Sequence, residues 1–137
     1  MYNTDNIGEI SILPDVPSGK YDLDRVIEVE DGTLIVELKN NHGKKIVISF
    51  GNGTLAYQRM EEECDLKRVD KLMSYLEEKN IEKNTLYLVK ESPMINEIRE
   101  KSCGIRGEDD LNHYLIVSSN YLMDIIIRDE CIVLTDN

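Results

Sequence analysis

The stretch NHYLIVSSNYLMDIII, residues 112–127, constrains the fold more than any other part of the chain. Two apolar segments flank a short polar turn, which is the pattern of a β-hairpin. The first segment contains His113, one of only two histidines in the chain, and the second contains Asp124. An unpaired buried carboxylate costs several kcal/mol or takes up a proton. We therefore expect the fold to bring a polar partner to Asp124.

The sequence offers His113 as that partner. If residues 119–120 form the turn, Leu115 lies opposite Asp124, and His113 lies diagonally across from Asp124 on the same face. A shift of the register by one residue would place Tyr114 opposite Asp124 instead, and the tyrosine hydroxyl could also serve. We predict that His113 and Asp124 form a structural polar pair. A role in partner binding and a role in catalysis are the two alternatives.

Alternating apolar and polar residues predict a strand meander in the first half of the chain. Within residues 24–50, three alternating segments are separated by the turn sequences DG and NNHG. Asp-Gly is a strong hairpin signal, and Asn and Gly both tolerate positive φ. A further strand is predicted near residues 55–60. Period-2 alternation of this kind implies a sheet that is covered on one face only.

Two helices are predicted after the meander. Residues 61–80 carry one apolar stripe at helical spacing, formed by Val69, Leu72, Met73 and Leu76. Asp65 suits the N-cap of this helix, and Ser92 followed by Pro93 suits the start of a second helix that ends near Gly104. Strands are predicted at 85–90 and 131–135. The order of elements indicates an α+β fold, a mainly antiparallel β-sheet with two helices packed on one face.

The length of 137 residues indicates one domain. Residues 1–20 contain two of the three prolines and lack clear periodicity, so we expect a partly ordered N-terminal arm with one short apolar element at 10–13. Residues 21–137 are expected to form a single α+β domain. The chain has no basic segment followed by an apolar core at its start, and no apolar run of the ~20 residues that span a membrane. Three widely spaced cysteines suit a reduced, cytoplasmic setting.

The formal net charge of −11 restricts the partners of the chain. Nucleic acids and anionic membranes are bound through Lys and Arg, so we expect neither as a partner. An acidic protein attracts basic proteins and speeds their encounter. Two acidic clusters are candidate partner-binding surfaces: Glu61, Glu62, Glu63 and Asp65, and separately Glu108, Asp109 and Asp110. Taken alone, each cluster is more simply explained as a solvated helix start or a solvated loop.

Catalysis, metals and cofactors find little support in the residues. The chain lacks the GxSxG motif that presents a nucleophilic serine, and GNGT at 51–54 lacks the Lys-Ser/Thr pair of a phosphate-binding loop. His42 lies in a predicted turn, so the two histidines do not suggest a metal site. We therefore expect no metal and no cofactor. A small hydrolase that uses His113 and Asp124 is the alternative, and it would require both residues at the mouth of a deep pocket beside a serine or cysteine.

The segments TLYLVKESPMINEIREKSCGI and HYLIVSSNYLMDII together resemble a group of small bacterial proteins. In that group a strand and a Ser-capped helix lead to an HY strand, and a second strand follows with Asp before a β-branched residue. The segment ISFGNGTLAYQRMEEECDLKRV is similar to a further region of the group, in which Tyr57, Arg59, Glu61 and Glu62 take comparable places. The resemblance spans about residues 46–134. The second helix and the link before the last strand depart from the pattern.

Members of that group are immunity proteins of polymorphic toxin systems, which neutralise the toxin encoded beside them. The resemblance implies a non-catalytic inhibitor that binds a cognate toxin domain. The acidic charge agrees with this, because toxins that cleave nucleic acid carry basic clefts. We expect the partner to be a basic protein toxin domain, with a homodimer or a homo-oligomeric structural module as further possibilities.

Overall fold

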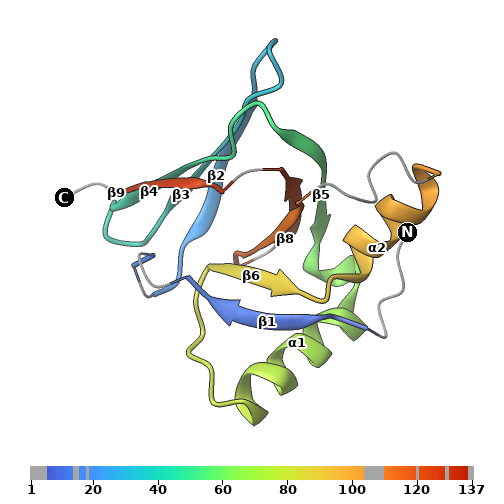
Figure 1. The fold of residues 1–137 in the computed structure, drawn as a ribbon. Helices are drawn as coiled ribbons and strands as arrows, with labels where there is room; N and C mark the ends of the chain where they lie inside the picture. The colour runs from blue at the N-terminus through green and yellow to red at the C-terminus, as the bar shows by residue number, and fades with distance from the viewer. Residues whose placement is uncertain are drawn as a thin grey trace.

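Two antiparallel sheets and two α-helices make up the described part of the computed structural model of this protein (Figure 1). The structure describes residues 6–13, 16–17, 19–103, 110–119, 121–128 and 130–135. The elements are β1 (Glu9–Ile12), β2 (Asp22–Glu28), β3 (Leu34–Lys39), β4 (Lys45–Ser49), β5 (Thr54–Glu61), a 3₁₀ turn η1 (Glu62–Cys64), α1 (Leu66–Glu78), β6 (Leu86–Lys90), α2 (Pro93–Lys101), β7 (Asn112–Val117), β8 (Tyr121–Ile127) and β9 (Ile132–Thr135).

The strands divide into a five-stranded sheet, in the order β1-β6-β7-β8-β5, and a four-stranded sheet, in the order β2-β3-β4-β9. All neighbouring strands are antiparallel. The predicted α+β class with mainly antiparallel strands is confirmed. The expectation of one sheet is incomplete, because the meander β2–β4 pairs with β9 and forms a second sheet.

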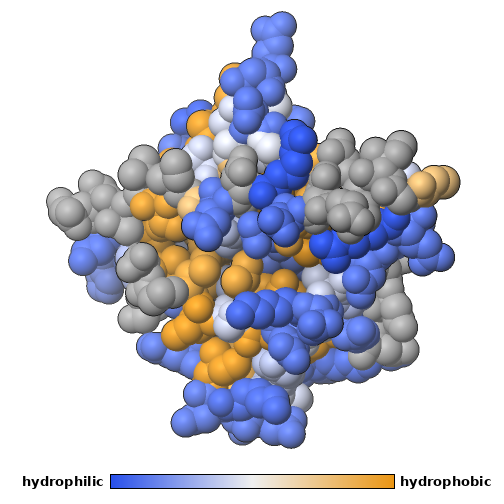
Figure 2. Space-filling view, viewed as in Figure 1, coloured by the Kyte–Doolittle hydropathy of each residue, from blue (hydrophilic) through white to orange (hydrophobic). Residues whose placement is uncertain are grey.

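The five-stranded sheet is the middle layer and is covered on both faces. One face packs against the four-stranded sheet, in a core that includes Val36 of β3, Ile48 of β4 and Ile116 of β7. The opposite face packs against α1 through Leu72 and Leu76. In Figure 1, α1 lies below β1 and β6 and α2 lies to the right, while Figure 2 shows hydrophilic residues at the bottom of the same view, where α1 lies.

The central hairpin has the predicted register. Leu115 lies opposite Asp124 and His113 lies opposite Ile126, so His113 and Asp124 are diagonal neighbours on the face that the helices cover. The backbone amide of Ser118 donates to the carbonyl of Tyr121 at 3.0 Å and closes the turn. The alternative register, with Tyr114 opposite Asp124, is therefore wrong. Tyr114 lies on the other face, in the core between the two sheets.

Both helices begin as predicted. The side chain of Asp65 accepts a hydrogen bond from the backbone amide of Arg68, and the side chain of Ser92 accepts one from the amide of Ile95. These bonds satisfy amides that have no partner within the helix. Asn80 follows α1 with a φ of 54°, in the left-handed region that ends many helices. The predicted end of α2 at Gly104 lies outside the described residues.

The apolar element expected within residues 1–20 is β1, which pairs with β6 at the edge of the five-stranded sheet. Ile10 on this strand is 3% exposed and belongs to the core beneath α1. The N-terminal segment therefore contributes a strand to the domain, and residues 1–5, 14–15 and 18 lie outside the described part of the chain.

Candidate functional site

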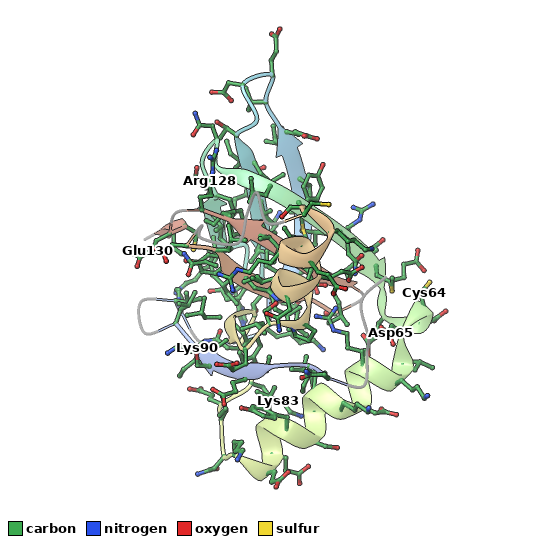
Figure 3. All side chains as sticks on the ribbon, turned by 45° about the vertical axis from the view of Figure 1, so that its right-hand side comes forward. Cys64, Asp65, Lys83, Lys90, Arg128 and Glu130 are labelled. Carbon is green, nitrogen blue, oxygen red and sulfur yellow. The ribbon has the colours of Figure 1, made fainter. Side chains whose placement is uncertain are left out.

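The first acidic cluster lies where β5 passes into α1. Glu61 is the last residue of β5, and Glu62 and Glu63 belong to the 3₁₀ turn η1. Glu61 and Glu63 are exposed, whereas Glu62 is half-buried. Figure 3 shows Cys64 and Asp65 at this junction, at the start of α1. The three consecutive glutamates thus occupy a short, irregular link between two regular elements.

These glutamates line a surface hollow of about 510 Å³ together with Leu66 and Tyr121. We call the hollow formed by these five residues the acidic hollow. Leu66 is 57% exposed, the highest value among the large apolar residues of the described chain. Tyr121 is half-buried. The hollow therefore combines carboxylates with an exposed aliphatic side chain and an aromatic ring.

The other predicted partner-binding residues have different positions. Asp65 is half-buried, and its carboxylate accepts the amide hydrogen of Arg68, so it serves as the N-cap of α1. Glu108 and Asp109 lie outside the described residues, and Asp110 is exposed. The structure therefore gathers three of the predicted acidic residues into one hollow and shows a structural contact for a fourth.

His113 and Asp124 are in direct contact, as the hairpin register predicts. The Nε2 atom of His113 lies 2.6 Å from Oδ1 of Asp124, and each residue is 1% exposed. This contact places an imidazole and a carboxylate in the core between the five-stranded sheet and the helices. Two further residues, which reasoning from the sequence does not connect to the pair, extend it at both ends.

Arg68 extends the pair from the side of α1. Its two terminal nitrogens lie 2.6 Å from the two carboxylate oxygens of Asp124, and Arg68 is 5% exposed. Arg68 precedes Leu72 and Leu76 at four-residue spacing and so belongs to the buried stripe of α1. An arginine at such a position is the signal in the sequence that could have identified the partner of Asp124.

Ser92 extends the pair from the side of α2. Its Oγ atom lies 2.6 Å from Nδ1 of His113 and also accepts the amide hydrogen of Ile95 at 3.1 Å. The hydroxyl hydrogen is therefore available for Nδ1, which leaves Nε2 to donate to Asp124. We call the four residues Ser92, His113, Asp124 and Arg68 the buried polar chain.

The ionisation of Asp124 depends on this chain. Burial raises the pKa of the carboxyl group, but the hydrogen bonds from Arg68 and His113 and the charge of Arg68 outweigh it and lower the pKa to about 2. Asp124 is therefore ionised at neutral pH, and Arg68 supplies the opposite charge. A buried charge of this kind is retained only when it is paired and hydrogen-bonded.

The buried polar chain does not have the arrangement of a hydrolytic triad. In such triads the serine contacts Nε2 and the carboxylate contacts Nδ1, whereas here Ser92 contacts Nδ1 and Asp124 contacts Nε2. Ser92 lines a surface hollow of about 350 Å³, but it is only 4% exposed and its oxygen is engaged as the cap of α2. Neither His113 nor Asp124 lines any of four surface hollows of the described chain.

In the part of the chain that the structure describes, the three cysteines form no disulfide and the potential metal-ligating residues form no metal cluster. Cys64 and Cys103 are exposed, Cys131 is half-buried, and all three are free thiols. Within the described residues, no cluster of three or more His, Cys, Asp or Glu side chains could hold a metal ion.

Burial raises the pKa of Tyr114 to about 12, and its hydroxyl accepts the amide hydrogen of Cys131, which ties β7 to the segment before β9.

Comparisons with known proteins give no match: no protein family model, no curated protein and no solved structure corresponds to this chain. In the described part of the chain, none of the helices has the length and apolar character needed to cross a membrane.

Proposed function

We propose that this protein is a non-catalytic immunity protein that binds a cognate bacterial toxin and neutralises it by covering a basic cleft with an acidic surface. The observation that carries the proposal is the hollow formed by Glu61, Glu62 and Glu63 with Leu66 and Tyr121. Carboxylates steer a basic partner toward the surface, and apolar side chains beside them contribute contact area once water is displaced.

The net charge of −11 supports the same class of partner. The long-range electric field of an acidic protein raises its rate of encounter with a basic protein. The same field repels nucleic acid, so this chain would approach a basic nuclease toxin and not the nucleic acid that the toxin cleaves. Tyr57, Arg59 and Glu61, which take part in the resemblance to immunity proteins, alternate along β5 and are all exposed. This edge strand leads directly into the hollow.

The alternative of a small hydrolase has less support. It requires an accessible nucleophile beside His113 and Asp124, and the hydroxyl that contacts His113 belongs to the buried cap residue Ser92. Arg68 binds both oxygens of Asp124, so this carboxylate already takes part in a buried ion pair. We therefore assign the buried polar chain a role in stability.

The proposal is tested with the protein encoded by the adjacent gene. Its C-terminal domain is produced in bacteria with and without this chain, and growth and co-purification are measured. Growth arrest that only co-expression relieves, together with a stable complex, is the expected result. A domain that is harmless when produced alone, or toxicity that persists despite co-expression, would overturn the proposal.

A further inference from the structure

A separate hollow of about 450 Å³ lies against α1 and shares Glu62 with the acidic hollow. Its size is within the roughly 300–1,000 Å³ that small-molecule sites occupy. Val69 and Met73 of α1 line one side, and Val117 and Leu122 of the β7–β8 hairpin line another. Leu122 is 2% exposed and the other three are half-buried, so the lining is largely apolar and is fixed by the core beneath it.

Two lysines stand at the rim of this hollow, Lys20 and Lys83. One threonine connects the segments that carry them. The hydroxyl of Thr85 donates to the carbonyl of Gly19 at 3.1 Å and accepts the amide hydrogen of Tyr21 at 3.3 Å, so it binds the residues on both sides of Lys20. Lys83 precedes Thr85 by two residues on the segment between α1 and β6, and Figure 3 shows its position.

Lys20 and Lys83 are both exposed, so their ammonium groups can meet a ligand at the rim. Two positive charges at one hollow contrast with the net charge of −11 of the whole chain. Asn84 and Ser118 add uncharged polar groups to the same lining, and Glu62 is the one acidic residue among its described members. An apolar body with a negatively charged head group matches this distribution, because the body would cover the lining while the head group meets the lysines.

We propose that this hollow binds a small organic anion with an apolar body, and that Lys20 and Lys83 hold its acidic group. The proposed ligand site adjoins the surface proposed for toxin binding, and the two share Glu62. The ligand class follows from the apolar lining and the two lysines, and carboxylates, sulfonates and phosphate esters all satisfy it.

The probe is 8-anilinonaphthalene-1-sulfonate, an aromatic anion that fluoresces when it leaves water, titrated into the folded full-length protein. The expected result is saturable binding of one probe per chain that weakens as salt is added. The uncharged analogue N-phenyl-1-naphthylamine measures the contribution of the charge. Binding that never saturates, or equal affinity for the charged and uncharged probes, would overturn the proposal.

Two matched pairs of variants locate the binding. Lys20→Glu/Lys83→Glu should weaken probe binding by about tenfold, whereas Lys44→Glu/Lys45→Glu, the same charge change at the start of β4, should alter it less than about threefold. Met73→Glu should abolish binding, whereas Ser74→Glu, on the exposed side of α1, should leave it intact. Equal effects within either pair would place the probe elsewhere and exclude this hollow.

Discussion

The guanidinium of Arg68 and the carboxylate of Asp124 form a buried two-pronged ion pair, with both nitrogen–oxygen distances at 2.6 Å. The two residues are separated by 56 positions in the chain, and they join the first turn of α1 to the middle of β8. Together with Ser92 and His113, this pair connects both helices to the central hairpin.

Removing one member of the ion pair should destabilise the protein strongly. Arg68→Met leaves the carboxylate of Asp124 buried without this counter-charge, and we expect the free energy of unfolding to fall by about 3–5 kcal/mol. Urea denaturation monitored by circular dichroism measures the change. The double variant Arg68→Met/Asp124→Leu removes both charges and should recover part of the loss. Additive effects of the two substitutions would contradict a direct pair.

Acid should destabilise the protein through Asp124. Its pKa is about 2 in the folded protein against an ordinary value of 3.8, so the unfolded chain takes up a proton at a higher pH than the folded chain does. The contribution of ionised Asp124 to the free energy of unfolding is therefore complete above about pH 5. It is lost as the pH falls toward about 2, by roughly 2 kcal/mol in total. Urea denaturation of the parent protein and of Asp124→Asn across this pH range measures the part of the pH dependence that Asp124 contributes. An unchanged pH dependence in that variant would contradict the assignment.

Ser92 should contribute to stability through two hydrogen bonds at once. Ser92→Ala removes the cap of α2 and leaves Nδ1 of His113 without its partner, so we expect a loss of about 1–3 kcal/mol. Ser74→Ala, a matched change on the exposed side of α1, should alter stability by less than about 0.5 kcal/mol. Thermal and urea denaturation of both variants make the comparison. Equal stability of the two would show that the hydroxyl of Ser92 is dispensable.

Charge reversal at the acidic hollow should weaken the proposed complex with a toxin. Glu61→Lys/Glu62→Lys/Glu63→Lys replaces attraction of a basic partner by repulsion, and we expect the affinity to fall by at least roughly tenfold, mainly through slower association. Surface plasmon resonance measures both rates, and a melting temperature close to that of the parent confirms folding.

The matched control is Glu77→Lys/Glu78→Lys/Glu82→Lys, which makes the same charge change at exposed positions at and beyond the other end of α1. It should retain affinity within about threefold, because screening limits the reach of surface charge. A similar loss in both triple variants would indicate that net charge, and not this hollow, controls binding.

Local features of the fold can be predicted from the sequence because local chemistry determines them. Asp65 and Ser92 have the side chains and the sequence setting of helix caps, and both accept the amide hydrogens of a first helical turn. The length of the hairpin turn sets the register that places His113 beside Asp124. Each of these predictions depends on residues that are close together in the sequence.

Long-range contacts could not be predicted, because they depend on residues that are far apart in the sequence. The pairing of β9 with β4 divides the strands between two sheets, and alternation within a strand does not identify its neighbour. Arg68 reaches Asp124 across the packing of a helix on a sheet. Its four-residue spacing from Leu72 marks it as a buried arginine, but that spacing does not say where on the sheet it lies. The contact of Ser92 with His113 also requires the position of α2, although the serine itself is recognisable as a cap.

The place of Arg68 within α1 has a consequence for the acidic surface. Anchoring the first turn of the helix to β8 holds the segment just before it, which contains residues 61–63, between a paired strand and a fixed helix. A partner that docks there meets a backbone that is already ordered, so little conformational entropy is lost when the complex forms.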